Sequence, residues 1–217
     1  MSLRQYEDYG EVHANQHIQG IYPAKWTYLA AKRIMDIILG GIILLLTLPL
    51  ITVVAGLIKL ESPGPIIYSQ RRLGLEGKVF TIYKLRSMYY KQYEYEQAWT
   101  SQNDFRITRV GSFIRKCRID ELPQLLNVLK GDMSLVGPRP EQPKLAEIFT
   151  CFLPEFSQRL SVKPGLTGWA QVNGGYDLSV KSKLARDMYY IREKTFWLDM
   201  KILFKTLIVL VTFKGAR

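Results

Sequence analysis

The feature that most constrains the fold is an apolar run over residues 37–58, which contains no charged residue. About 20 consecutive apolar residues are enough for a helix to cross the hydrocarbon core of a bilayer. Gly40, Gly41 and Pro49 interrupt this run. Pro49 removes one backbone hydrogen bond and should kink a helix at the preceding turn, and Thr47 is a candidate partner for a carbonyl that is freed there. The run therefore predicts a membrane helix that is broken at Pro49.

Basic residues flank the apolar run on both sides. Lys32 and Arg33 precede it, and the residues that follow it include Lys59, Arg71, Arg72 and Lys78. A helix that spans a bilayer usually shows a bias of Lys and Arg to one side. Basic flanks on both sides favour a helix that enters the bilayer, bends at Pro49 and leaves by the same face. A straight span and a helix buried in a soluble core remain alternatives.

The chain carries 30 Lys and Arg against 19 Asp and Glu, a formal net charge of +11. Such a surface favours phosphate in nucleic acid, anionic lipid or a nucleotide. Both histidines, His13 and His17, lie in a polar N-terminal region, and Cys117 and Cys151 form neither a metal-ligand spacing nor a disulfide framework. An enzyme built from this chain would therefore use carboxylates as acid, base, nucleophile or metal ligand.

Two adjacent carboxylates, Asp120 and Glu121, stand at the start of a predicted short helix. Asp120 suits the N-cap position, Pro123 suits the first turn, and Gly131 predicts the end of the helix. The apolar stripe of this helix is Leu122, Leu125, Leu126 and Leu129. Free N–H groups at a helix start favour anions, so the segment could hold a divalent metal and a phosphate together. On these residues alone, a structural cap is the simpler interpretation.

The rest of the pattern predicts an α+β fold that is mostly helical. Short strands over 66–68 and 79–83 should form a small β-hairpin with a basic tip, and helices should follow over 141–160 and 178–193. An amphipathic stretch over 196–213 is too short in its apolar part to span a bilayer and should lie in the interface. Residues 163–175 should form a glycine-rich loop in which backbone N–H groups can approach a ligand.

Three motifs carry a resemblance to a known family: RIDELPQL at 118–125, LKGDMSLVGPRP at 129–140 and PGLTGWAQVNG at 164–174. Together they resemble the bacterial sugar transferases, the monotopic phosphoglycosyl transferases, over about residues 27–213. Three long motifs in the same order make this resemblance specific. It implies a polar tail over 1–24, a re-entrant membrane helix with its lead-in over 25–60, and a cytoplasmic catalytic domain over 61–217. The chain resembles the minimal catalytic unit of larger members.

The resemblance implies transfer of a sugar-1-phosphate from a UDP-sugar to undecaprenyl phosphate, with release of UMP. Mg²⁺, or Mn²⁺ in its place, would be the cofactor. Asp120 would be the nucleophile and would form a covalent phosphosugar intermediate, while Glu121 would assist at the metal. The enzyme would lie at the cytoplasmic face of the bacterial plasma membrane and begin the assembly of a surface glycan.

Further site residues follow from the same resemblance and from the charges. Phosphate contacts are expected first from Arg139, in the stiff Gly-Pro-Arg-Pro turn, and then from Arg118, Lys84 and Arg86, each of which could instead form a structural ion pair. The glycine-rich loop would contact the nucleotide or sugar through Thr167, Gly168, Gln171, Asn173 and Gly175. Many members have Ser before the helix-breaking proline, whereas this chain has Leu48.

The sugar and the partners are less constrained. Some relatives have Arg after the Asn-Gly pair, where this chain has Gly175 and Tyr176, and a plain hexose is the favoured sugar. Membrane phospholipids are expected partners, nucleic acid is not, and a homodimer is left open. The main alternative function is a membrane-anchored protein without activity that binds anionic lipid or assembly partners. Nucleic-acid binding is disfavoured by the apolar run and by the absence of a binding motif.

Overall fold

The computed structural model describes residues 24–90, 104–174 and 178–212. The N-terminal tail up to residue 23 and the predicted sugar-facing Gly175 lie outside these ranges. The described elements are mostly helical with two small sheets, so the prediction of a mainly helical α+β fold is confirmed.

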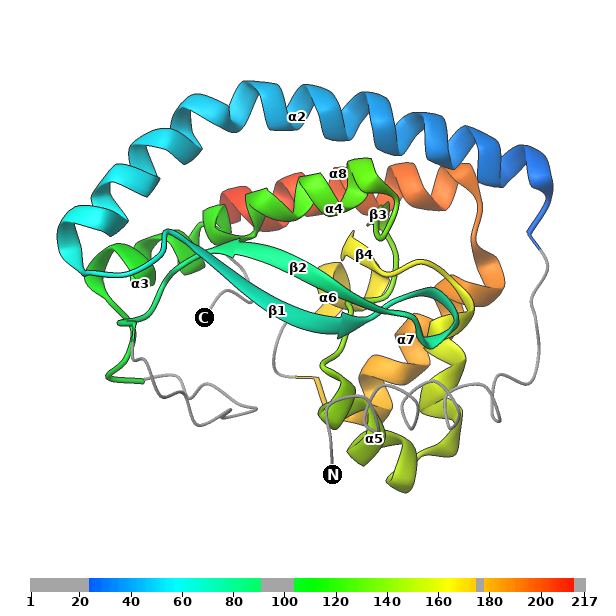
Figure 1. Ribbon diagram of the computed structural model, residues 1–217. Helices are drawn as coiled ribbons and strands as arrows, with labels where there is room; N and C mark the ends of the chain where they lie inside the picture. Colours follow the sequence, from blue (N-terminus) through cyan, green and yellow to red (C-terminus); the bar gives the residue numbers. More distant parts are fainter. Residues whose placement is uncertain (1–23, 91–103, 175–177, 213–217) are drawn as a thin grey trace.

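Helix α2 (Trp26–Glu61) contains the whole apolar run and is the one described helix that is long and apolar enough to cross a membrane. In the most apolar part only 11% of the residues are buried, which is unlike the core helix of a soluble protein. Pro49 lies inside the helix without ending it, so the expected break is a curve within one continuous helix (Figure 1).

Thr47 does not bond to the carbonyl that Pro49 leaves without a donor. A proline at position 49 leaves the carbonyl of Leu45 without its usual donor. The Thr47 hydroxyl instead donates to the carbonyls of Ile43, at 2.7 Å, and Leu44, at 3.3 Å. Thr47 therefore bonds one turn back along the helix, and its expected contact with the freed carbonyl is not made.

Both ends of α2 are fixed to the rest of the molecule. Near the start, Arg33 donates to the carbonyls of Val128 and Leu129 at 2.7 Å each. Near the end, Glu61 accepts from the N–H groups of Arg109 and Val110 and so caps α3 (Arg109–Lys116). Figure 1 shows α2 as an arch whose two ends come down onto the other elements.

A hairpin of β1 (Ile67–Leu73) and β2 (Val79–Leu85) extends from the end of α2, with η1 (Leu75–Gly77) at its tip. The strands are antiparallel and are longer than the sequence predicts, because pairing continues from Ile67↔Leu85 to Leu73↔Val79. After α3 the chain enters η2 (Ile119–Gln124) and α4 (Leu125–Lys130). Gly131 ends α4 at φ 96°, as predicted.

The second sheet was not predicted. It pairs β3 (Ser134–Val136) in parallel with β4 (Gly165–Thr167), so that two of the sequence motifs lie side by side. Glycine is required here because a Cβ at Gly165 would lie 2.0 Å from the nitrogen of Gly137, and one at Gly168 would lie 2.1 Å from its oxygen. The predicted loop over 163–175 is therefore a strand followed by the short helix α6 (Trp169–Gly174) as far as it is described.

The remaining helices are α5 (Pro143–Phe152), η3 (Pro154–Ser161), α7 (Val180–Glu193) and α8 (Phe196–Thr212). The helix predicted over 141–160 is thus divided at Leu153. Pro154 follows, and a proline disfavours the helical conformation of the residue before it. The main core joins α4, β3, α7 and α8 through Leu125, Val136, Ile191 and Ile202. A second cluster joins the end of α2 to β2 and α3 through Val54, Ile58, Leu85 and Ile114.

Candidate active site

The carboxylate pair lies in η2, and its local geometry differs from the predicted helix cap. Arg118 precedes η2 with φ 58°, in the left-handed region, and no side chain caps the turn. Asp120 and Glu121 are therefore inside a tight 3-10 turn rather than at an N-cap. They are 8% and 7% exposed, which removes both carboxylates from most of the surrounding water.

Two cations from other elements reach Glu121. The ammonium group of Lys84, on β2, donates to Glu121 Oε1 at 2.8 Å and lies 3.9 Å from Asp120 Oδ2. The guanidinium of Arg139, after β3, donates from Nη1 to Glu121 Oε2 at 3.2 Å and from Nη2 to Oε1. The structure thus brings together Asp120, Glu121, Lys84 and Arg139, four of the residues predicted from the sequence.

The pKa values of the two carboxylates are shifted in opposite directions, because nearby cations neutralise them unequally. Burial raises the pKa of Asp120 to about 6, with a further increase from Glu121, against opposing contributions from Lys84, Arg139 and Arg115. Burial would also raise the pKa of Glu121, but Arg139 and Lys84 hold it well below its usual range. Glu121 is therefore a firmly charged anchor for two cations, whereas Asp120 is the less stabilised and more basic carboxylate.

Arg115 is a contributor that the sequence analysis did not assign to the site. It lies in the last turn of α3, and its positive charge lowers the pKa of Asp120. The available signal was its position in the basic stretch just before Asp120. Because α3 ends at Lys116 and the chain turns at Arg118, the charge of a residue in α3 acts on a residue in η2.

The other two predicted phosphate ligands are placed differently. Arg86 is 5% exposed, and its guanidinium donates to the carbonyls of Pro63 and Ser62 at 2.7 Å each. These bonds hold the chain that leaves α2 and favour the structural alternative for Arg86. Arg118 forms the left-handed corner before η2, and its carbonyl accepts from the N–H of Glu121 at 3.2 Å. Their phosphate contacts stay predictions.

The glycine-rich segment forms a separate group of polar contacts. Thr167 shares a hydrogen bond with Thr206 at 2.8 Å, Gln171 donates to the carbonyl of Leu166, and Asn173 accepts from Lys205 at 2.7 Å. Gly168 lies against the backbone of Gly137. The segment is therefore joined to the Arg139 loop through backbone packing, and its role toward a nucleotide or sugar stays a prediction.

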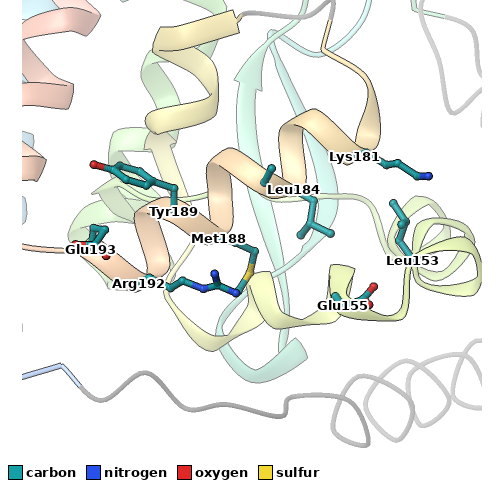
Figure 2. Close-up of a pocket in the computed structure, with 9 residues that line it drawn as sticks. Leu153, Glu155, Lys181, Leu184, Met188, Tyr189, Arg192 and Glu193 are labelled. Atoms are coloured by element: carbon teal, nitrogen blue, oxygen red, sulfur yellow. The ribbon is translucent and has the colours of Figure 1, made fainter.

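A hollow of about 520 Å³ lies along one face of α7. Figure 2 shows that most of its lining comes from α7, including Leu184, Met188 and Tyr189. Leu153, which joins α5 to η3, and Glu155 of η3 complete this part of the lining. None of the predicted site residues lines it. The predicted site residues therefore lie outside this hollow, and the carboxylate pair is in the buried cluster around η2.

A comparison with known protein families assigns the chain to one of them. Residues 27–213 match the family described as bacterial sugar transferase. The chain belongs to this family. The match covers the carboxylate pair, both cations that contact it and the glycine-rich segment.

Curated relatives within the family are similar over most of this chain. It is 45% identical over 209 residues to a UDP-N-acetylgalactosamine-undecaprenyl-phosphate N-acetylgalactosaminephosphotransferase of Aeromonas hydrophila, covering 95% of this chain and 49% of the relative. It is 42% identical over 189 residues to a UDP-glucose:undecaprenyl-phosphate glucose-1-phosphate transferase of Escherichia coli K12, covering 85% and 40%. The chain therefore spans half or less of the length of these two relatives.

The donor set at η2 fits a hard divalent cation in part. Among the residues that the structure describes, no group of three or more His, Cys, Asp or Glu side chains could hold a metal. Asp120 and Glu121 provide carboxylate oxygens, and Mg²⁺ is commonly held by one or two carboxylates together with substrate phosphates and water. The two carboxylates supply only part of a coordination shell, so Mg²⁺ would need further oxygens from a phosphorylated substrate and from water.

Proposed function

We propose that this chain transfers a sugar-1-phosphate from a UDP-sugar to undecaprenyl phosphate and releases UMP. The observation that carries the proposal is the buried Asp120–Glu121 pair, in which Lys84 and Arg139 neutralise Glu121 and leave Asp120 the more basic group. The printed activities of the relatives support the same reaction class.

In the first step, a carboxylate oxygen of Asp120 attacks the phosphorus that carries the sugar. The bond between this phosphorus and the bridging oxygen of UMP breaks, and UMP leaves with the electron pair. Lys84 and Arg139 offset the negative charge that builds up around the phosphate, which is the electrostatic contribution that such a reaction requires. Glu121 holds these cations in place through its two oxygens.

In the second step, a phosphate oxygen of the lipid acceptor attacks the same phosphorus and releases the Asp120 carboxylate. A covalent intermediate lets one site serve a soluble donor and then a membrane-bound acceptor. Asp120 and Glu121 would hold Mg²⁺, or Mn²⁺, which when bound would neutralise charge on the donor diphosphate.

The attachment of α2 supports a membrane placement in which both helix ends are on one side. A full crossing would separate the ends by the ~30 Å hydrocarbon core. Arg33 instead bonds to α4 and Glu61 to α3, and both of these helices pack against η2. We infer that α2 enters the bilayer and returns, at the cytoplasmic face of the bacterial plasma membrane. Exposed apolar residues would contact phospholipid, including Leu45, Leu46, Leu48 on α2 and Trp197, Phe204, Val211 on α8.

The experiment that tests the reaction is incubation of the purified chain with undecaprenyl phosphate, Mg²⁺ and a panel of UDP-sugars. The panel should include UDP-glucose, UDP-galactose and UDP-N-acetylgalactosamine, because the relatives' names include both a hexose and an N-acetylated sugar. We expect UMP release with at least one donor, and a plain hexose is the favoured one. No UMP with any donor would support the alternative of an inactive, membrane-anchored binding protein.

The topology has its own test. Single cysteines placed before residue 32 and after residue 60, in a background in which Cys117 and Cys151 are replaced by Ser, should both react with a membrane-impermeant thiol reagent added from the cytoplasmic side. Labelling of the two positions from opposite sides would reject re-entry and support a straight span.

A further inference from the structure

The backbone around Arg139 is held by donors from three other parts of the fold. The carbonyl of Pro138 accepts from the N–H of Gly165 at 2.9 Å. The carbonyl of Arg139 accepts from Arg159 Nη2 at 2.8 Å, and the carbonyl of Pro140 accepts from Arg72 Nη1 at 3.2 Å. Three successive carbonyls are therefore fixed, two of them by guanidinium groups.

Such external donors are needed because Arg139 lies between two prolines. Proline has no N–H, so residues 138 and 140 cannot be held by hydrogen bonds from their own amides. The carbonyls are the groups through which this turn can be fixed to its surroundings. Whatever holds them also sets the starting point from which the Arg139 side chain reaches Glu121.

Arg159 is itself firmly anchored. Its side chain is 4% exposed, its Nε donates to Asp187 Oδ2 on α7 at 2.7 Å, and its Nη1 lies 3.8 Å from Glu141 Oε1. The guanidinium also stacks over the ring of Phe156 at 4.6 Å. Charge-assisted bonds in a buried setting are short and directional, so Arg159 is a rigid support for the carbonyl of Arg139.

Arg72 supports the next residue, Pro140, from the hairpin. It lies on β1, and its Nη2 donates to Gln70 on the same strand at 2.6 Å. The following residue, Leu73, donates its N–H to the carbonyl of Glu141 at 2.9 Å. The end of β1 is thus fixed to residues 140 and 141 by one side-chain and one backbone bond.

We propose that Arg159 and Arg72 are positioning residues that act through Arg139. They hold the Pro-Arg-Pro backbone so that the Arg139 guanidinium stays on Glu121 and faces the donor phosphate, and Asp187 keeps Arg159 in place. This inference rests on the proposed function, because it assigns Arg139 a task in the phosphosugar transfer.

The test is a double-mutant cycle on kcat/KM for UMP release, with Arg159→Met measured in the native chain and in an Arg139→Lys background. A residue that acts through Arg139 should matter only while Arg139 is present. We expect a loss of ~10-fold or more in the native chain and ~3-fold or less in the Arg139→Lys background, which is the non-additivity of coupled residues. Arg72→Met should show the same pattern with a smaller loss.

Lys183→Met is the matched control. Lys183 lies on α7 and pairs with Glu141 in the same buried ionic cluster, and its ammonium group donates to the Glu141 carboxylate rather than to the 138–140 backbone. Its substitution should change kcat/KM by the same factor in both backgrounds. Equal factors for Arg159→Met in both backgrounds would overturn the positioning role, while UMP release by the native chain would leave the proposed function standing.

Two additions keep the cycle decisive. If Arg159→Met does not fold, as judged by its melting curve, Arg159→Lys and Arg72→Met replace it. If the Arg139→Lys background turns over too slowly, the same cycle is measured on the dissociation constants of UDP-glucose and UDP-N-acetylgalactosamine. Loss of affinity in the native chain alone would support positioning, and equal loss in both backgrounds would reject it.

Discussion

Two groups of buried carboxylates in this molecule are neutralised to different degrees. Glu141 and Asp187 share the cations Arg159 and Lys183, with Arg159 Nε 2.7 Å from Asp187 Oδ2. Burial would raise the pKa of Glu141, but Lys183 and Arg159 lower it below its usual value. Asp120 lies 3.9 Å from Lys84, and burial raises its pKa to about 6.

We interpret this difference as that between a structural cluster and the proposed catalytic one. Close cations stabilise the charged form of a buried carboxylate and lower its pKa. A buried carboxylate without such close cations has a raised pKa and is therefore more basic. Lys84 and Arg139 make their closest contacts with Glu121, so Asp120 is left as the more basic carboxylate and as the proposed nucleophile. Four measurements test this contrast.

The largest effect should come from Asp120→Asn on activity. We expect UMP release to fall by ~10³-fold or more, because the amide cannot act as the nucleophile. Mass spectrometry should find no phosphosugar adduct on the variant. Asp132→Asn, which alters an exposed carboxylate in the neighbouring segment, should keep the adduct. An adduct that persists at another residue of the Asp120 variant would remove Asp120 from this role.

The next effect should come from Asp187→Asn on stability. Removing the charge of Asp187 leaves the buried Arg159 with only Glu141, at 3.8 Å, as a counterion, and we expect the free energy of unfolding to fall by about 3 kcal/mol. Urea unfolding in detergent, followed by circular dichroism at 222 nm, measures this change. Lys181→Met, on the outer face of the same helix, is the control. A loss below about 0.5 kcal/mol would show that the cluster is less tightly coupled than its distances indicate.

The same measurement on Asp120→Asn should give the opposite sign. A carboxyl group whose folded pKa is raised destabilises the folded state when it is ionised, so at pH 7.5 the amide should increase the free energy of unfolding by about 1–2 kcal/mol. The comparison is made with EDTA present, so that no divalent metal ion binds the carboxylates. Destabilisation by this substitution would mean that Asp120 is as well matched as Asp187.

The smallest effect concerns pH. The folded pKa of Glu141 is lowered, so its contribution to stability is present above the unfolded pKa and is lost as pH falls through the folded pKa. The stability advantage of the native chain over Glu141→Gln should therefore shrink by on the order of 1 kcal/mol between pH 6 and pH 3. Urea midpoints at several pH values measure it, and a difference that does not change with pH would contradict the pairing of Glu141.

Local signals predicted much of the fold. The long apolar helix, the hairpin and the helices over 178–193 and 196–213 follow from composition and periodicity and are present as α2, β1–β2, α7 and α8. The division at Leu153 was also readable, because Pro154 follows it. The β3–β4 pair was not, since its parallel strands are three residues long and join segments about 30 residues apart.

The carboxylate pair shows the same limit in the site. Adjacent Asp and Glu before a leucine stripe predicted a cap at Asp120, whereas the left-handed Arg118 places both residues inside the 3-10 turn. Arg86, which the sequence placed with the phosphate ligands, is committed to the carbonyls after α2. Arg159 carries no local signal at all, because its partner Asp187 is 28 residues away.

The amino-acid sequence was enough to predict the family, the apolar helix and the candidate catalytic residues, because motifs and hydrophobic patterns are properties of neighbouring residues. Only the tertiary structure decided which cation neutralises which carboxylate. Lys84 and Arg139 lie 37 and 18 residues from Glu121 and meet it through packing of the hairpin and the β3 turn. Burial and the distances to these charges set the difference between Asp120 and Glu121, and neither quantity exists until the chain is folded.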